Sequence, residues 1–203
     1  MGRVLIIGID PSSRKMAYIA SPLTGPAVWK HVLLLPPKKE TVTCMMAYRY
    51  TYRLISDYQK KGYDVRVFVE RAVGAGGGGF GSLIPQVEAV GAVMAACGML
   101  NVPVTKVQNS KWKKEVCGKG NATKGEIKAW CGEYWRLAYD LAAGDQDVLD
   151  AACINRWGVA NTPKGLAMRA VPRKIAAKKN PNRRPPKRVF KKTAKKTAKK
   201  GMR

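Results

Sequence analysis

The stretch VLIIGID, residues 4–10, decides the fold of this 203-residue chain. Its first four residues form a continuous apolar run rich in β-branched side chains, which predicts a strand buried on both faces. The run ends at Asp10, directly before Pro11. The chain contains only 13 Asp plus Glu against 38 Lys plus Arg, so an acid at the end of a buried strand is a candidate for chemistry. The alternative is an ordinary turn acid before proline.

Outward from this strand, the pattern of apolar residues predicts alternating strands and helices. We expect further strands at residues 15–20, 27–35, 65–69 and 102–107, and helices at residues 41–60, 84–100, 110–116, 124–141 and 146–159. Helix caps are suggested by Asn109 or Ser110, by Thr123 and by Asp145. One face of the helix at 84–100 carries Ile84, Val87, Gly91, Met94 and Gly98.

Three more acids lie where this order of elements brings chain ends together. Glu70 ends the strand at 65–69, and Asp147 and Asp150 lie one helical turn apart, so that both face the same way. The order is that of an α/β ribonuclease H-like fold, with a mixed five-stranded sheet flanked by helices. In that fold, adjacent central strands bring Asp10 and Glu70 together, and the last helix lays the other two acids against them. The alternative is that each acid has an ordinary role, with Glu70 as a surface acid at a strand end and the two aspartates in the solvated first turn of a helix.

Such a group of carboxylates predicts a metal site. Three or four carboxylates within a few ångströms repel one another unless cations are present, and hard oxygen ligands suit Mg²⁺, for which Mn²⁺ can substitute. Two such ions roughly 4 Å apart would activate a water and stabilise the leaving oxygen of a phosphodiester. No covalent nucleophile is then required.

The charge of the chain indicates a polyanionic partner. The formal net charge is +25 and the pI is near 10.2, which favours nucleic acid. Residues 161–203 contain 17 Lys plus Arg and no Asp or Glu, and the repeat KKTAKKTAKK at 191–200 cannot form a core. We therefore predict a nuclease domain at 1–160 and a disordered basic tail at 161–203. A solubilising or ribosome-like extension is the alternative for the tail.

Nothing in the sequence predicts a membrane span or an export signal. No apolar stretch approaches the roughly 18 to 20 residues that a membrane span requires. The cysteines are odd in number and form no C-x-x-C pair, which argues against zinc and a disulfide framework and for reduced thiols: Cys44, Cys97, Cys117, Cys131 and Cys153. We expect a cytoplasmic protein, or one in the host cytoplasm if it is viral.

Four ordered motifs resemble the RuvC-type Holliday junction resolvases. The segment GIDPSSR (8–14) is similar to the family signature Gly-Ile-Asp-Pro-Gly-Ser-Arg, and VER (69–71) looks like its Ile-Glu-Gln strand end. The segment KKEVCGKGNATKGEI (113–127) follows the family's Lys-x-x-Val-x-Gly-x-Gly-x-Ala-x-Lys-x-x-Val stretch, and DVLDAACI (147–154) is similar to its closing helix. The resemblance covers residues 3 to 158.

The resemblance implies a site and a mode of action. Asp10, Glu70, Asp147 and Asp150 would be metal ligands and catalytic acids, with Lys113 and Lys124 at the phosphate near the scissile bond. The wider set of candidate DNA-binding residues is Ser12, Arg14, Arg71, Phe80, Lys111, Lys113, Lys114, Lys119 and Lys124. The family acts as a homodimer that cuts two symmetric strands of a four-way junction. The helix at 84–100 would be the dimer helix, with an intramolecular core helix as the alternative.

The chain departs from the family pattern in three places. Ser12 replaces a glycine of the signature, and a basic tail of this length is not general in the family. After Glu70, where the family places an aromatic residue near the junction centre, the chain has Val73 and the glycine-rich segment 74–79 before Phe80. Phe80 would wedge at the crossover or anchor the loop to the core. The short chain, tail and divergent loop are compatible with a phage origin.

Competing motifs are weak. The segment 74–79 formally matches G-x-G-x-x-G without a ribose-binding acid beyond it, and His31, the one histidine, is expected to be structural. Trp112, among lysines, is either a core residue or a contact to a base or sugar. We therefore predict a Mg²⁺-dependent endodeoxyribonuclease that resolves four-way junctions. The alternatives are a broader nuclease for branched or flapped DNA and a non-catalytic basic DNA-binding protein.

Overall fold

A computed structural model describes residues 3–12, 14–35, 40–72 and 80–163. The strands are β1 (Arg3–Pro11), β2 (Lys15–Pro22), β3 (Trp29–Leu34), β4 (Tyr63–Glu70) and β5 (Val104–Val107). The helices are α1 (Glu40–Lys60), α2 (Phe80–Met99), α3 (Asn109–Cys117), α4 (Lys124–Tyr134), α5 (Arg136–Ala142) and α6 (Gln146–Asn161). No helix within these ranges is long and apolar enough to cross a bilayer.

The strands form one mixed five-stranded sheet, as the sequence predicts, and their order is β3-β2-β1-β4-β5. β1 is the central strand, antiparallel to β2 and parallel to β4, and β5 is parallel to β4. Parallel strands end at the same edge of a sheet. The ends of β1 and β4, which carry Asp10 and Glu70, therefore lie side by side.

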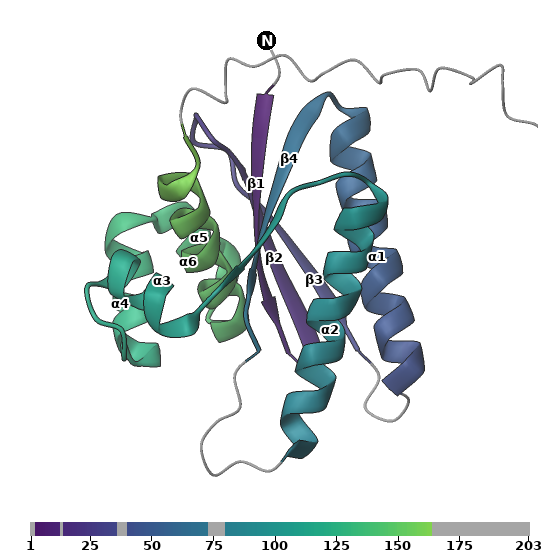
Figure 1. Cartoon of the computed structure of the whole chain (residues 1–203). Helices are drawn as coiled ribbons and strands as arrows, with labels where there is room; N and C mark the ends of the chain where they lie inside the picture. The colour runs from purple at the N-terminus through teal and green to yellow at the C-terminus, as the bar shows by residue number, and fades with distance from the viewer. Residues whose placement is uncertain (1–2, 13, 36–39, 73–79, 164–203) are drawn as a thin grey trace, which may run out of the picture. The chain divides into compact units, whose positions relative to one another are not determined.

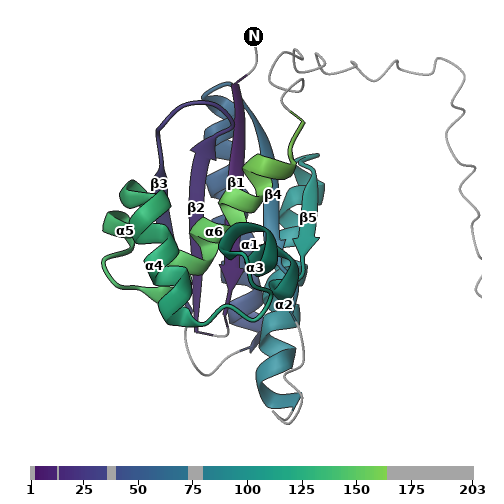
Figure 2. The ribbon, with the colours of Figure 1, turned by 90° about the vertical axis from the view of Figure 1, so that its left-hand side faces the viewer.

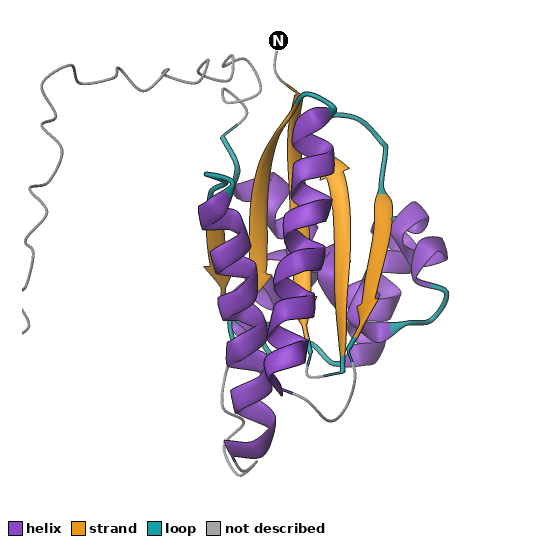
Figure 3. Cartoon of the chain, turned by 90° about the vertical axis from the view of Figure 1, so that its right-hand side faces the viewer, coloured by secondary structure: helices purple, strands orange, loops and turns teal. Residues whose placement is uncertain are grey.

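Helices cover both faces of the sheet. Helices α1 and α2 lie on one face and α3 to α6 on the other (Figure 1). Figure 2 shows α6 lying across the sheet behind α3 and α4, and Figure 3 shows the opposite face behind α1 and α2. Side chains alternate along a strand, so Leu5, Ile7 and Ile9 of β1 enter the core beneath α1 and α2. Val4 and Ile6 enter the core beneath α6.

Close backbone contact fixes α6 on the sheet. A Cβ atom at Gly8 would lie only 2.3 Å from the Asn155 nitrogen and 2.5 Å from the Ala151 oxygen, so only glycine allows α6 to approach β1 this closely. Further along the helix, a Cβ at Gly158 would lie 2.4 Å from the Phe68 ring. The buried Asn155 side chain donates to the Ile6 oxygen at 2.7 Å and to the Ile19 oxygen at 3.0 Å. These contacts set how closely α6 lies against β1 and β2.

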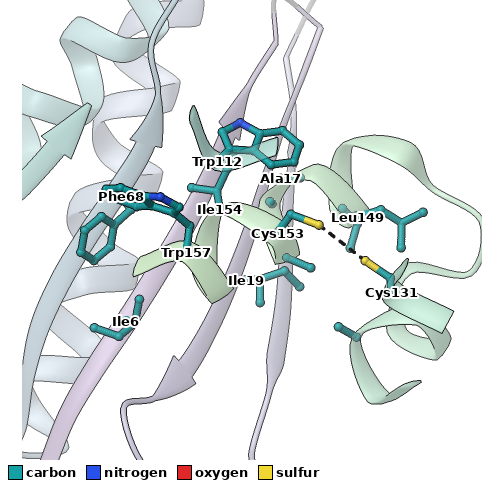
Figure 4. Packing of buried hydrophobic residues seen from close by; sticks show 14 of the residues in the cluster. Ile6, Ala17, Ile19, Phe68, Trp112, Cys131, Leu149, Cys153, Ile154 and Trp157 are labelled. Carbon is teal, nitrogen blue, oxygen red and sulfur yellow. Dashed lines mark hydrogen bonds between the residues drawn. The ribbon is translucent and has the colours of Figure 1, made fainter. Parts of the chain in front are cut away.

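The core beneath α6 is continuous with the helices that surround it. Figure 4 shows Trp157 against Phe68 and the fully buried Trp112 near Ile154. The rings of Phe68 and Trp157 pack edge to face, with centroids 5.8 Å apart. The strand carrying Glu70, helix α6 and helix α3 are therefore packed into one unit.

The face of α2 predicted from the sequence points to solvent. Ile84, Val87 and Met94 are 48%, 53% and 38% exposed, and a Cβ at Gly91 or Gly98 would have no neighbour within 4 Å. This row is therefore not buried within the described part of the chain, and whether it forms a dimer stays a prediction. The opposite face, with Ala89, Val93 and Cys97, enters the core.

Two details of the predicted helices are wrong. The helix expected at 124–141 breaks at Trp135, whose backbone has φ −143° and ψ 61°. On one continuous helix, Trp130 and Trp135 would point about 140° apart, and the break lets both pack against the core beneath α6. The N-cap of α3 is Gln108, whose side chain makes no capping hydrogen bond, and not Asn109 or Ser110 as predicted. The Asn109 side chain instead donates a hydrogen bond to Glu70. The caps at Thr123 and Asp145 are confirmed.

Some predictions fall outside the described residues. They concern the glycine-rich segment at 73–79, the side chain of Phe80 and the basic tail from residue 164 onward. The division of the chain at residue 160 stays a prediction.

Candidate active site

The four predicted acids converge at one edge of the sheet. In the parallel pair β1 and β4, Gly8 lies beside Phe68 and Ile9 beside Val69, so Asp10 and Glu70 follow at the same level. Asp10 has the parity of Gly8, which touches α6, and Glu70 has the parity of Phe68, which touches Trp157 of α6. Both acids therefore face α6, whose first turns carry Asp147 and Asp150.

The acids interact electrostatically. Burial raises the pKa of Asp10 well above its usual range, and the charges of Glu70, Asp150 and Asp147 raise it further. Burial also raises the pKa of Asp150 to about 6; the hydrogen bond from Gln146 opposes this rise, while the charge of Glu70 adds to it. The site thus holds negative charge that the surrounding protein compensates only in part.

Two donors from α3 orient the Glu70 carboxylate. Asn109 Nδ2 donates to Glu70 Oε1 at 2.6 Å, and Trp112 Nε1 donates to Oε2 at 3.1 Å. Burial raises the pKa of Glu70, and these two hydrogen bonds oppose the rise. Since the Trp112 indole is fully buried, its contact to a base or sugar is excluded. The sequence holds a signal for this pair, because residues 109 and 112 are three apart on one helix face.

Lys15 holds the start of α6. Its Nζ lies 2.8 Å from Asp145 Oδ1 and 3.0 Å from Asp147 Oδ2, and Asp145 Oδ1 accepts a hydrogen bond from the Asp147 nitrogen at 3.1 Å. Lys15 was not predicted as part of the site, because its contact with Asp145 spans 130 residues of the chain. Gln146 Nε2 similarly donates to Asp150 Oδ1 at 2.8 Å. Gln146 could have been found, since it lies one turn before Asp150.

The chemistry of the acids fits a hard divalent cation, although their side chains do not enclose one. Among the described residues, no three acidic, cysteine or histidine side chains are close enough to hold a metal ion. Glu70 and Asp147 have protein partners in this structure. The raised pKa values of Asp10 and Asp150 nonetheless identify oxygen donors whose charge a hard cation would neutralise.

A cavity of about 430 Å³ opens beside the first two acids. Its lining residues come from the ends of β1 and β4 and from the beginnings of α2 and α3: Asp10, Pro11, Glu70, Arg71, Ala72, Gln86, Gln108, Asn109 and Ser110. Gln86, Gln108 and Ser110 are polar residues that were not predicted as part of the site. The cavity gives Asp10 and Glu70 a polar opening at this edge of the sheet.

Lys113 is the predicted lysine that lies within electrostatic reach of the acids. Its charge lowers the pKa values of both Glu70 and Asp150, against the raising effect of burial. Its Nζ lies 5.5 Å from the centre of the Trp112 ring. Lys111 lies on another side of α3, with Nζ 5.3 Å from the Trp157 ring, and Lys114 is exposed.

The other predicted DNA-binding residues lie at the rim or further away. Arg71 lines the cavity. The Ser12 nitrogen donates to the Lys15 oxygen at 2.9 Å in the turn that leads to the exposed Arg14. Lys119 Nζ is paired with Glu126 at 2.5 Å, and Lys124 is the first residue of α4. His31 Nε2 lies 2.9 Å from the Tyr58 hydroxyl, which fits the predicted structural role.

A central pair of parallel strands ending in acids, with a final helix that carries two more, is the arrangement of a ribonuclease H-like fold. No family model matches the chain. The chain is 26% identical over 179 residues to the crossover junction endodeoxyribonuclease RuvC of Teredinibacter turnerae, a match covering 84% of this chain and 95% of that protein. The resemblance to RuvC-type resolvases predicted from the sequence is thereby confirmed.

Two solved structures share the fold. The Thermus thermophilus RuvC structure matches with a TM-score of 0.58 and 17% identity, over 78% of this chain and 98% of that one. The structure of T. thermophilus RuvC in complex with Holliday junction substrate matches with a TM-score of 0.56 and 20% identity, over 77% and 97%. The five-stranded ribonuclease H-like architecture is therefore confirmed.

Proposed function

We propose that this chain is a structure-selective DNA endonuclease that resolves four-way junctions. The observation that carries the proposal is the convergence of Asp10, Glu70 and Asp150, with Asp147 beside them, at one edge of the sheet. This convergence occurs in a chain that aligns with a crossover junction endodeoxyribonuclease over 95% of that protein's length. A similar fold has been solved with a Holliday junction substrate.

The same carboxylates would hold divalent cations, with Mg²⁺ as the proposed ion. Asp10 and Asp150 are the first candidates, since burial leaves their charge poorly compensated, and Glu70 and Asp147 complete the set. Bound cations would supply Lewis-acid activation of water and neutralisation of charge on the phosphate. Mn²⁺ is expected to substitute, because it also accepts hard oxygen ligands.

The residues around the acids have separate tasks in this proposal. Asn109 and Trp112 keep Glu70 in one orientation, and Gln146 does the same for Asp150. Lys113, whose charge already acts on Glu70 and Asp150, would bind the phosphate next to the scissile bond. Arg71, which lines the cavity, would contact the DNA backbone next to that phosphate.

The exposed face of α2 would form the homodimer. Ile84, Val87 and Met94 form an apolar row on α2, and the uncrowded Gly91 and Gly98 permit a second helix to approach closely. Two copies joined there would place two sites on one junction, which symmetric cutting requires. Equilibrium sedimentation tests this directly: Gly91→Leu together with Met94→Glu should yield monomers that bind DNA but make no paired nicks.

The test of the proposed function is cleavage of an end-labelled immobile four-way junction beside its linear duplex, with Mg²⁺ or with EDTA. Paired symmetric nicks that require Mg²⁺ and spare the duplex are expected. Asp10→Asn and Asp150→Asn should abolish nicking while junction binding persists, whereas Asp140→Asn, which breaks only an exposed ion pair with Arg136, should cut normally. Indiscriminate cutting would favour a broader nuclease, and binding without cutting an architectural protein.

A further inference from the structure

Three of the five cysteines form one cluster behind the acids. Cys131 and Cys153 are fully buried, with their Sγ atoms 3.7 Å apart, as the dashed line in Figure 4 marks. The Cys117 side chain, which is only half-buried, packs against the core cluster that contains this pair, and the Cys153 thiol acts on the pKa of Cys117. Cys117 therefore connects the buried pair to the surface.

The cluster joins the two helices that carry the charged residues of the site. Cys117 lies four residues after Lys113 on α3, and Cys153 lies three residues after Asp150 on α6. Residues three or four apart share a helix face. The charge of Lys113 acts on Asp150, so the thiols meet one helical turn beyond a charged pair of the site.

We propose that Cys117 and Cys153 form a modification site, at which a small peroxide converts the two thiols into a disulfide between α3 and α6. The peroxide O–O bond breaks as the Cys117 sulfur is oxidised to a sulfenic acid, and one water leaves. The Cys153 sulfur then attacks the Cys117 sulfur, the S–O bond breaks, and a second water leaves. Two thiols and one peroxide thus give one disulfide and two waters.

The surroundings assign different parts to the two thiols. The Cys153 thiol lowers the pKa of Cys117, which favours the thiolate that reacts with peroxide. Cys117 is also the accessible member, whereas Cys153 is buried and poised to resolve the sulfenic acid. Cys131, on the other side of Cys153, cannot meet peroxide first, because its side chain is fully buried.

The disulfide would change the geometry of the acids. A disulfide has an S–S length of about 2.05 Å, well below the separation of unbonded thiols, so α3 and α6 must move together. Because α6 lies against the backbone at Gly8 and adjusts with difficulty, α3 must take up most of the movement. Helix α3 carries Asn109 and Trp112, whose hydrogen bonds orient Glu70, so this acid would shift relative to Asp150. We expect oxidation to slow junction nicking by a factor of about 10 or more; this effect on cleavage rests on the proposed function, whereas the disulfide itself does not.

The experiment treats the reduced full-length protein with hydrogen peroxide, alkylates the remaining thiols and maps tryptic peptides without reduction. Trypsin cleaves after Lys114, Lys119, Lys128, Arg136 and Arg156, so the three cysteines fall in three different peptides. The expected product is the peptide of Cys117 linked to that of Cys153, and dithiothreitol should reverse both the link and the loss of nicking. Cys117→Ser should prevent both, and Cys44→Ser, which removes a half-buried cysteine elsewhere, should prevent neither.

Two outcomes would overturn the proposal: no linked peptide, or stable over-oxidation of Cys117 in place of the link. A link without any change in nicking would overturn the expected effect on the acids. If the untreated protein does not nick junctions, the proposed function has failed. The peptide map then still decides whether the disulfide forms.

Discussion

Replacing Gly8 by alanine should move the acids of α6 away from the acids at the ends of β1 and β4. Gly8 lies on β1 two residues before Asp10, on the face that α6 covers. The added Cβ would meet three backbone atoms of α6: the Asn155 nitrogen at 2.3 Å, the Ala151 oxygen at 2.5 Å and the Asn155 Cα at 2.6 Å. No side-chain rotation can relieve contacts with backbone. Helix α6 itself must therefore move away from the sheet.

The size of the effect follows from these distances. Ordinary contacts to a Cβ begin at 3.4 Å, so α6 must retreat by about 1 Å. Overpacking of this kind costs about 3 kcal/mol when the neighbours cannot yield. The retreat also stretches the two hydrogen bonds from Asn155 to the Ile6 and Ile19 oxygens. A displacement of about 1 Å at a catalytic group can reduce the rate by about 100-fold.

Urea denaturation measures the first effect and single-turnover nicking of a four-way junction measures the second. Gly132→Ala is the matched control, because Gly132 lies inside α4 and its Cβ would meet only the ring of Tyr139, from α5, at 3.6 Å. This control should gain up to about 1 kcal/mol and cut normally. If Gly8→Ala unfolds at the same urea concentration as the original protein and nicks at the same rate, the close approach of α6 does not position the site.

Four further changes test other parts of the argument. Because burial raises the folded-state pKa of Asp150 to about 6, its ionisation opposes folding above about pH 4; in EDTA, Asp150→Asn should therefore raise the free energy of unfolding by up to about 3 kcal/mol at neutral pH, but hardly at pH 4 or below. Trp112→Phe leaves buried Glu70 without one donor and should cost about 1 to 3 kcal/mol and slow nicking, whereas Trp157→Phe, which loses a donor to Glu115 instead, should cost stability and leave nicking intact. Lys15→Met unpairs Asp145 and Asp147 and should lower the free energy of unfolding at neutral pH by about 1 to 3 kcal/mol in urea titrations. Removing residues 164–203 keeps the end of α6 intact, since the Thr162 hydroxyl still donates to the Gly158 oxygen. In a filter-binding assay this deletion should weaken junction binding and flatten its dependence on salt, while the nicking rate of the bound complex stays unchanged.

Each of these changes has an outcome that contradicts it. The pKa argument fails if Asp150→Asn raises the free energy of unfolding by the same amount at pH 4 and at neutral pH. Trp112→Phe and Trp157→Phe would have to affect nicking alike. Lys15→Met would have to match the original stability at neutral pH, and the shortened chain would have to retain the full salt dependence of binding.

The positions of Asp10 and Glu70 could be predicted because they depend on regular geometry. A buried strand ends at the same sheet edge as its parallel neighbour, and side chains alternate along both. The apolar row of α2 was equally predictable, because it repeats with the period of a helix, but the period does not say whether the row faces solvent or the core. Lys15 was not predictable in this way. Its partners lie 130 and 132 residues further along the chain, and no local pattern pairs them.

Trp112 and the helix break at Trp135 show a second limit of local patterns. Both tryptophans have helical spacing, but spacing does not say which one hydrogen-bonds a carboxylate and which one ends a helix. Trp112 lies over Glu70 because α3 begins immediately after β5, the strand next to β4. Trp135 leaves the helix because Trp130 and Trp135 both pack against one core. Tertiary packing decides both cases.

The same packing explains how the chain tolerates poorly compensated acids in its interior. Asp10 and Asp150 oppose folding at neutral pH, since burial disfavours their charged forms. Helix α6 could relieve this by moving outward, but Asn155 is hydrogen-bonded to two strands and to the Ser21 hydroxyl, and Gly158 seats the Phe68 ring. These anchors lie one to three turns beyond Asp150, away from the acids themselves. The fold therefore holds the carboxylates together through contacts made elsewhere on α6, and these contacts do not involve the oxygens of Asp10 and Asp150.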